Sequence, residues 1–160
     1  MTATVDHIQS TRMRTSPRLP DPAARPDYYA GVPSKRFGAW VIDLTLVTFA
    51  AALLLPFTAF LGIFFFPVMM TVVGFFYRWS TLAGGSATWG MRLMGIELRE
   101  ADGLRLTSGT ALAHTFGYLV SMAIPVLQVI SIILMLTTER KQGLTDIVLG
   151  TAALNRPWGA

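Results

Sequence analysis

Residues 37–77 read FGAWVIDLTLVTFAAALLLPFTAFLGIFFFPVMMTVVGFFY and contain a single charged side chain, Asp43. A bilayer core of about 30 Å needs roughly 20 helical residues for one crossing, so this stretch is long enough for two. Helices of soluble domains turn a polar face to water, and this stretch has no such face. It therefore predicts an all-α integral membrane protein with a transmembrane helical hairpin, whose spans cover about residues 38–57 and 61–81.

The composition agrees with a membrane protein and excludes several other classes. Only 14% of the residues are charged, against roughly 25% in an average soluble domain. The absence of cysteine excludes disulfides, thiolate metal sites and cysteine nucleophiles. Lys and Arg lie mostly at the edges of the apolar segments, where such residues set membrane orientation. The net charge of +4 therefore does not indicate a nucleic-acid partner.

Residues 1–34 form a region of different composition. They hold five of the nine prolines and almost no periodic apolar pattern, so they are predicted to be a disordered tail. Six basic residues fall within positions 1–36, and the turn between the two apolar halves has none. The bias of basic residues toward the cytoplasm places the tail and residues 82–106 on that side, with only about residues 57–62 outside.

The segment 96–107 follows the alternating pattern of β-strands. Apolar and polar residues alternate on both sides of Asp102-Gly103, a dipeptide that is favoured in tight turns. The segment therefore predicts a short cytoplasmic β-hairpin. Two strands alone are marginal in water, so we expect the hairpin to pack against the membrane surface or the helices.

Residues 106–138 form a third apolar block, which is too long for one upright span and short for two. Pro125 interrupts it near the middle. In one arrangement a surface helix leads into a tilted third span; in the other, both halves dip into the bilayer and return to the cytoplasm. The basic residues after the block favour the second arrangement. We expect a third, proline-interrupted span at about residues 108–137, a transmembrane domain over residues 35–154 and a short C-terminal tail over residues 155–160.

Three charged residues stand out against the apolar background: Arg36, Asp43 and Asp146. The first two are seven positions apart, which puts them on one helix face about 10 Å apart along the axis. An acid at this depth is costly unless a cation, a basic side chain or water stabilises it. If the C-terminal tail is cytoplasmic, Asp146 lies on the same side and Arg36 can bridge the two carboxylates. The sequence thus predicts a polar network, or an ion site, made of these three residues.

Three segments resemble the motifs of one known family. Residues 36–43 (RFGAWVID) are similar to the opening motif of the RDD family, small membrane proteins named after one arginine and two aspartates. Residues 86–96 (SATWGMRLMGI) are similar to its cytoplasmic segment, and residues 141–151 are similar to its closing motif. The resemblance makes the three charged residues above the name-giving ones. It also marks six further motif residues, which are Thr88, Gly90, Arg92, Gly95, Gly150 and Thr151.

The chain departs from the family pattern at four positions. Ser86 stands where glycine is usual, Met91 where lysine is frequent, and Ile147 where a basic residue is frequent beside the last aspartate. His114 lies near a position that is commonly arginine. These departures remove positive charge from the cytoplasmic face and weaken the transfer of any charge-dependent activity.

The resemblance implies two kinds of role, because some family members are similar to sodium/proton antiporters and others to accessory parts of membrane assemblies. We expect an accessory or scaffold module, multi-pass in the plasma membrane with a cytoplasmic N-terminus. The alternative is cation or proton exchange by an oligomer, with Asp43 as the titrating site. Expected partners are the lipid bilayer and either another membrane protein or a second copy of the chain. We recognise no enzyme motif, cofactor site or metal-ligand spacing, and we interpret His114 as a packing residue.

Overall fold

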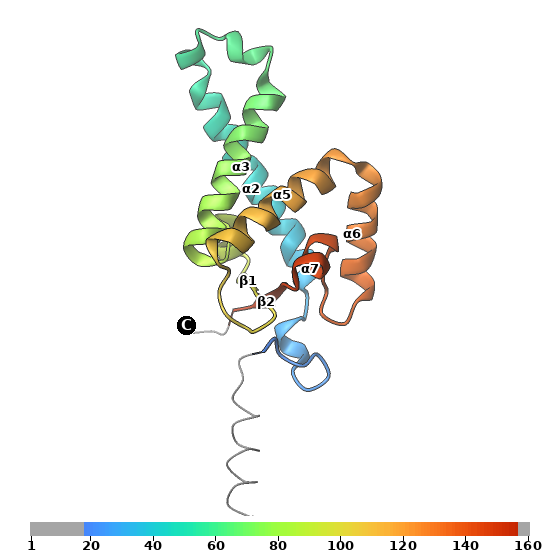
Figure 1. Ribbon diagram of the computed structural model, residues 1–160. Coiled ribbons are helices and arrows are strands. Elements are labelled where there is room, and N and C mark those ends of the chain that lie inside the picture. The colour runs from blue at the N-terminus through green and yellow to red at the C-terminus, as the bar shows by residue number, and fades with distance from the viewer. Residues whose placement is uncertain (1–17, 157–160) are drawn as a thin grey trace, which may run out of the picture.

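The computed structural model describes residues 18–156, which are mostly helical and include one two-stranded sheet (Figure 1). The elements in chain order are η1 (Pro26–Tyr28), α2 (Val32–Leu54), η2 (Pro56–Thr58), η3 (Leu61–Ile63), α3 (Phe66–Gly85), α4 (Trp89–Leu93), β1 (Ile96–Arg99), α5 (Ser108–Ala123), α6 (Pro125–Thr137), α7 (Leu144–Leu149) and β2 (Ala152–Asn155). The α2–α3 pair projects from one end, and the other elements gather around its base (Figure 1).

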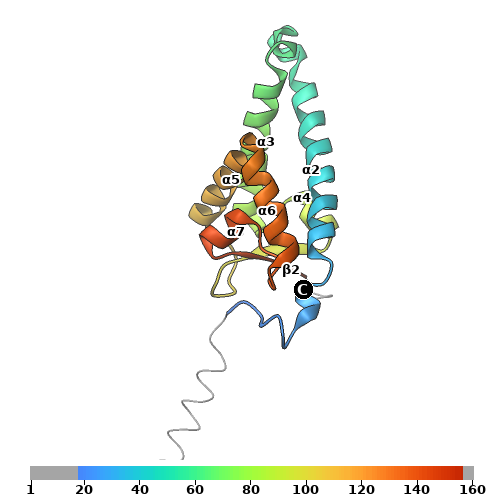
Figure 2. The ribbon, with the colours of Figure 1, turned by 90° about the vertical axis from the view of Figure 1, so that its right-hand side faces the viewer.

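Glycine and proline set the ends of the two long helices. α2 begins after Gly31, whose φ of +68° is readily adopted by glycine, and it ends at Leu54, shortly before Pro56. α3 begins at Phe66, so Pro67 lies in its first turn, where a missing N–H costs no helical hydrogen bond. The two helices meet near their connecting segment and separate toward the sheet (Figure 2).

One helical stretch among residues 18–156 is long and apolar enough to cross a membrane by itself. It covers Pro26–Leu54, and only 17% of an apolar 18-residue window in it is buried inside the chain. The α5–α6 pair is a second candidate if its two helices form one span. The predicted helical character is thus confirmed and α2 is a candidate span, whereas α3 begins later than the predicted residue 61.

The sheet differs from the predicted β-hairpin. β1 pairs antiparallel with β2 near the C-terminal end of the described residues, with Ile96 opposite Asn155. Residues 104–107 do not form the predicted second strand, and they contribute only an isolated bridge between Arg99 and Arg105. The sheet therefore ties the segment after α4 to the segment after α7.

The predicted turn is nevertheless present. Gly103 has a φ of +80°, and its N–H donates to the Glu100 carbonyl oxygen at 2.8 Å. The chain that follows belongs to α5, because the Thr107 hydroxyl caps that helix by accepting a hydrogen bond from the Thr110 N–H at 3.2 Å. The Leu98 N–H of β1 donates to the Ser86 carbonyl oxygen at 2.7 Å, and the Leu106 N–H donates to Ser86 Oγ at 2.8 Å. Ser86 thus takes the place of a second hairpin strand, and the hairpin prediction is wrong for that reason.

Residues 18–34 are not the disordered tail that their composition predicts. Leu19 and Tyr29 are buried against β2, and the Tyr29 hydroxyl donates to the Pro20 carbonyl oxygen at 2.8 Å. Burial of these side chains offsets the entropy that the proline-rich stretch loses on ordering. Residues 1–17, the other part of the predicted tail, lie outside the described residues.

The third apolar block is sharply bent. The axes of α5 and α6 turn by 116°, and the bend falls at Ile124, whose extended backbone precedes Pro125. α6 consequently runs back toward the sheet (Figure 1). The two halves of the block therefore run in different directions, and which of the two expected membrane arrangements they adopt stays a prediction.

The main core lies where the wide end of the α2–α3 pair meets α4, β1 and the start of α5. Its buried apolar side chains include Leu82, Ile96, Leu98 and Ala153. This packing brings α4 against α2 and α7 against α5, and it thereby positions the buried polar side chains of these helices.

Candidate functional site

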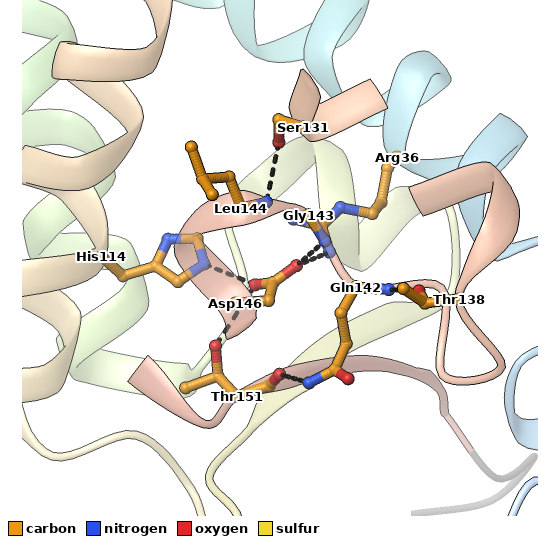
Figure 3. Close-up of polar contacts among 9 residues, drawn as sticks. All are labelled: Arg36, His114, Ser131, Thr138, Gln142, Gly143, Leu144, Asp146 and Thr151. Carbon is orange, nitrogen blue, oxygen red and sulfur yellow. Dashed lines mark hydrogen bonds and ion pairs between the residues drawn. The ribbon is translucent and has the colours of Figure 1, made fainter. Parts of the chain in front are cut away.

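Asp146 lies at the centre of a buried polar cluster (Figure 3). Its Oδ2 atom accepts a hydrogen bond within an ion pair from Arg36 and another from the Gly143 N–H at 2.9 Å. Its Oδ1 atom lies 2.8 Å from His114 Nε2 and accepts a hydrogen bond from the Thr151 hydroxyl at 3.2 Å. Each carboxylate oxygen thus has two partners, and the cluster joins α2, α5 and the C-terminal segment.

The charge of Asp146 is stabilised by its basic neighbours. Burial by itself raises the pKa of this carboxyl group, but Arg36 and the hydrogen bond from His114 outweigh burial and hold the pKa well below its usual range. Asp146 is therefore a carboxylate at neutral pH. Because a carboxylate only accepts hydrogen bonds, His114 carries a proton on Nε2 in this arrangement.

Contacts at both ends of α7 fix the orientation of Asp146. The Leu144 N–H donates to Ser131 Oγ of α6 at 3.0 Å. A Cβ atom on Gly143 would lie 2.8 Å from the same oxygen, so the close approach of the two segments requires glycine. Gly150 ends the helix with a φ of +66°. The helix that carries the carboxylate is therefore held against α6.

Asp43 forms a second buried polar cluster. Its Oδ1 atom accepts hydrogen bonds from the Tyr77 hydroxyl at 2.6 Å and the Gly90 N–H at 2.8 Å, and its Oδ2 atom accepts one from the Thr88 hydroxyl at 2.6 Å. These donors come from α3 and the start of α4, so the carboxylate joins both to α2. Gly90 packs so closely on α2 that a Cβ atom would lie 2.2 Å from the Ala39 carbonyl oxygen.

The three charged residues predicted to form one network are divided between these two clusters. Arg36 pairs with Asp146, because the returning C-terminal segment brings that carboxylate to the base of α2. Asp43 lies about two helical turns farther along α2, where neutral donors satisfy it. Within residues 18–156, Arg36 therefore forms an ion pair with one of the two carboxylates and does not bridge them.

The six family-motif residues all lie near the base of the helices. Arg92 of α4 places its guanidinium carbon 5.0 Å from the centroid of the Trp89 ring, in a cation–π contact. Gly95 has a φ of +69° where the chain turns from α4 into β1. The other four take part in the two clusters or end α7, and they are Thr88, Gly90, Gly150 and Thr151.

His114 and Tyr77 belong to the clusters but are not recognised as site residues from the sequence. The partner of His114, Asp146, is 32 positions away, so the histidine has no acid near it in the sequence. The one signal of a polar role is that His114 lies near a sequence position that is commonly arginine in the family. Tyr77 has the position of an interfacial aromatic residue, and nothing in the sequence indicates its bond to Asp43.

A pocket of about 210 Å³ lies between α2, α3 and α5. Its lining is largely apolar, but Asp43, Tyr77 and Arg78 contribute polar groups. Within the described residues, no group of three or more His, Asp or Glu side chains is placed to hold a metal ion. The pocket is thus largely apolar and is bordered by one acid and one base.

A comparison with protein-family models supplies the family. The model of the RDD family matches residues 30–150, a stretch that holds Arg36, Asp43 and Asp146. The chain belongs to the RDD family. This confirms the resemblance carried by the three motifs. No curated protein and no solved structure matches the chain. Family membership and the apolar helix α2 together suggest a membrane protein.

Proposed function

We propose that this RDD-family protein is an accessory or scaffold module of a membrane assembly, in which the two polar clusters are structural. The observation that carries the proposal is that both carboxylates are hydrogen-bonded by groups of the chain itself. Every oxygen atom of Asp43 and Asp146 accepts at least one hydrogen bond from within the chain. A carboxylate that binds and releases a cation needs an oxygen atom that faces the ion.

The clusters connect elements that are far apart in the sequence. Asp43 joins α2 to α3 and α4, and Asp146 joins α2 to α5 and α7. Buried ionic contacts add little net stability compared with apolar packing, and their value in some proteins is to specify one arrangement. The role proposed for these two clusters is to specify one arrangement of five helices, and so to present a constant surface to a partner.

The exposed apolar side chains of α2 and α3 support a placement in the membrane. Phe49 and Leu53 of α2 and Val68 and Phe76 of α3 are between 57% and 65% exposed, whereas soluble monomers rarely expose large contiguous apolar surfaces. We therefore propose a multi-pass protein of the plasma membrane. α2 and α3 cross the bilayer, α5 and α6 enter it and return, and the N-terminus and the sheet lie on the cytoplasmic side.

A second candidate function is cation or proton exchange by an oligomer, with Asp43 as the titrating group. The observation that favours it is that Asp43 lines the pocket between α2, α3 and α5. An ion that enters the pocket can therefore approach the carboxylate. A proton or cation at Asp43 competes with three donors from within the chain, and the scaffold role is preferred for that reason.

The test is to purify the full chain from membranes in mild detergent and to determine the mass and composition of the particle. The scaffold role predicts a second membrane protein in fixed stoichiometry, and no proton-coupled Na⁺ or K⁺ movement by the purified chain in vesicles. The matched variants are Asp43→Asn and Glu139→Gln, the latter at an exposed acid outside both clusters. A particle that contains only this chain, with exchange abolished by the first variant and preserved by the second, would overturn the proposal.

A further inference from the structure

Arg78 is a basic residue of α3 whose guanidinium group is incompletely bonded. Its Cζ atom lies 4.3 Å from the centroid of the Tyr118 ring, in a cation–π contact between α3 and α5. Its Nε atom is buried and has no hydrogen-bond partner among residues 18–156, and none of the ion pairs in that part of the chain includes Arg78. A buried cationic N–H without a hydrogen-bond partner in an apolar helix is costly, and a bound acceptor would remove that cost.

The pocket that Arg78 lines is polar at one end and apolar at the other. Arg78 and Asp43 lie at the end nearer the sheet. Val47 and Met70 line the pocket one to two helical turns closer to the segment that connects α2 and α3, and Met122 near the far end of α5 also lines it. Such a gradient fits a molecule with a polar head and an apolar chain.

The level of Arg78 in the proposed bilayer matches that of a lipid headgroup. Trp79 follows Arg78 directly, and Trp40 donates a hydrogen bond to the Tyr118 hydroxyl at 3.0 Å. Tryptophan is enriched where the hydrocarbon core meets the headgroups. A chain that leaves the guanidinium toward the apolar end of the pocket therefore enters the hydrocarbon core.

We propose that this pocket binds an anionic membrane lipid, whose phosphate or carboxylate group pairs with Arg78 and whose chain lies along Val47 and Met70. A guanidinium binds both groups through two parallel N–H donors. The Tyr118 hydroxyl accepts the hydrogen bond from Trp40 and can direct its own hydrogen at the ligand.

The size of the pocket also fits this occupant. Its volume of about 210 Å³ is below the roughly 300–1,000 Å³ of sites that enclose a whole small ligand. The pocket therefore holds the head and the first part of one chain, and the remainder of the lipid lies in the bilayer. Asp43 lies at the same end, but three donors already bond its carboxyl group. Arg78 is thus the group with hydrogen bonds to offer.

This inference rests on the proposed membrane placement and not on the scaffold role. The full chain is purified in mild detergent with equal amounts of phosphatidylglycerol and phosphatidylcholine that carry the same chains, and the retained lipids are quantified by mass spectrometry. Both headgroups carry a phosphate, but the choline ammonium of phosphatidylcholine neutralises that charge and is repelled by Arg78, so we expect a preference for phosphatidylglycerol of about tenfold. Arg78→Gln should bring the ratio close to one. The matched control is Arg105→Gln, which changes an exposed arginine outside the pocket and should leave the ratio unchanged.

A second variant tests the apolar end of the pocket without touching the arginine. Met122→Trp fills the pocket from α5 and should lower the retention of phosphatidylglycerol severalfold. If Arg78→Gln does not fold, Met122→Trp provides the test, and unchanged retention of phosphatidylglycerol by Met122→Trp overturns the proposal. Equal retention of the two lipids by the wild type, or an unchanged preference in Arg78→Gln, also overturns it.

Two further measurements distinguish a wrong lipid site from a wrong membrane placement. Millimolar inorganic phosphate should not displace the bound lipid, and complete displacement would show an anion site that does not need a chain. The membrane fraction of the cells is assayed for the wild-type chain. Its absence there would contradict the membrane placement, whereas a chain in the membrane without lipid preference contradicts only the lipid site.

Discussion

The Nε2 atom of His114 lies 2.8 Å from the Oδ1 atom of Asp146, although 32 positions separate the two residues in the chain. Arg36, which is 110 positions from Asp146, bonds the other carboxylate oxygen. One buried carboxylate is thus held by a residue of α5 and a residue of α2. These contacts fix the C-terminal segment, which follows the last apolar block, to the first long helix.

Replacing His114 by alanine should lower the free energy of unfolding by about 2–3 kcal/mol, because a buried carboxylate loses a charge-assisted hydrogen bond. The measurement is chemical unfolding of the purified chain in detergent. His114→Gln keeps an amide donor of similar reach and should cost less than the alanine variant. An equal loss for both variants would mean that packing, and not the hydrogen bond, gives His114 its effect.

A double-mutant cycle should separate the two polar clusters. Arg36→Met alone should cost about 3–5 kcal/mol, because it leaves the Asp146 carboxylate buried and unpaired. The double variant Arg36→Met/Asp146→Asn should lose less unfolding free energy than the two single variants lose in sum, with a coupling energy of about 1–3 kcal/mol. For the double variant Arg36→Met/Asp43→Asn, the losses of unfolding free energy should add within about 0.5 kcal/mol. Strong coupling of Arg36 to Asp43 would contradict the division into two clusters.

The contact between α4 and α2 should not tolerate a methyl group at Gly90. Its Cβ atom would lie 2.2 Å from the Ala39 carbonyl oxygen and 2.8 Å from Asp43 Oδ1. Gly90→Ala should therefore lower the free energy of unfolding by about 1–3 kcal/mol or more. The matched control is Gly84→Ala, because a Cβ atom there meets nothing within 4 Å. That variant should be neutral or slightly stabilising, and equal losses in the two variants would disprove the close approach.

Stability should depend on pH through Asp146. The folded state holds the pKa of this carboxyl group below its value in the unfolded chain, which is about 3.9. Its contribution is therefore fully present above that unfolded pKa and is lost as the pH falls toward the folded pKa. The difference in unfolding free energy between the wild type and Asp146→Asn, measured from pH 7 to pH 3, should shrink at the acidic end. A constant difference over this range would contradict the lowered pKa.

The proposed orientation predicts which side of the membrane each segment faces. The chain has no cysteine, so a single introduced thiol reports its own position. With an impermeant thiol reagent on intact cells, Phe57→Cys between α2 and α3 should be labelled and Ala24→Cys should not. Both positions are exposed in the folded chain, so the fold itself does not shield either thiol from the reagent. Labelling of Ala24→Cys from outside would reverse the orientation.

The sequence by itself determined the long helices and the family. The apolar stretch 37–77 predicted two helices, and Pro56 and Pro67 lie where one ends and the other begins. Three short motifs were enough to predict the RDD family, which the family comparison confirms. These features are local, because they depend on the hydrophobicity and backbone preferences of consecutive residues.

Only the tertiary structure decided which distant segments meet. β1 pairs with residues 152–155 and not with 104–107, and residues 18–34 are ordered against that same strand. Asp43 accepts hydrogen bonds from neutral donors. His114, which was expected to be a packing residue, forms a hydrogen bond with the carboxylate of Asp146. Such contacts form only when the chain has turned back at the α5–α6 bend and the helices have packed. No periodic pattern in the sequence encodes them, because their energy comes from the complementarity of side chains that are far apart in the chain.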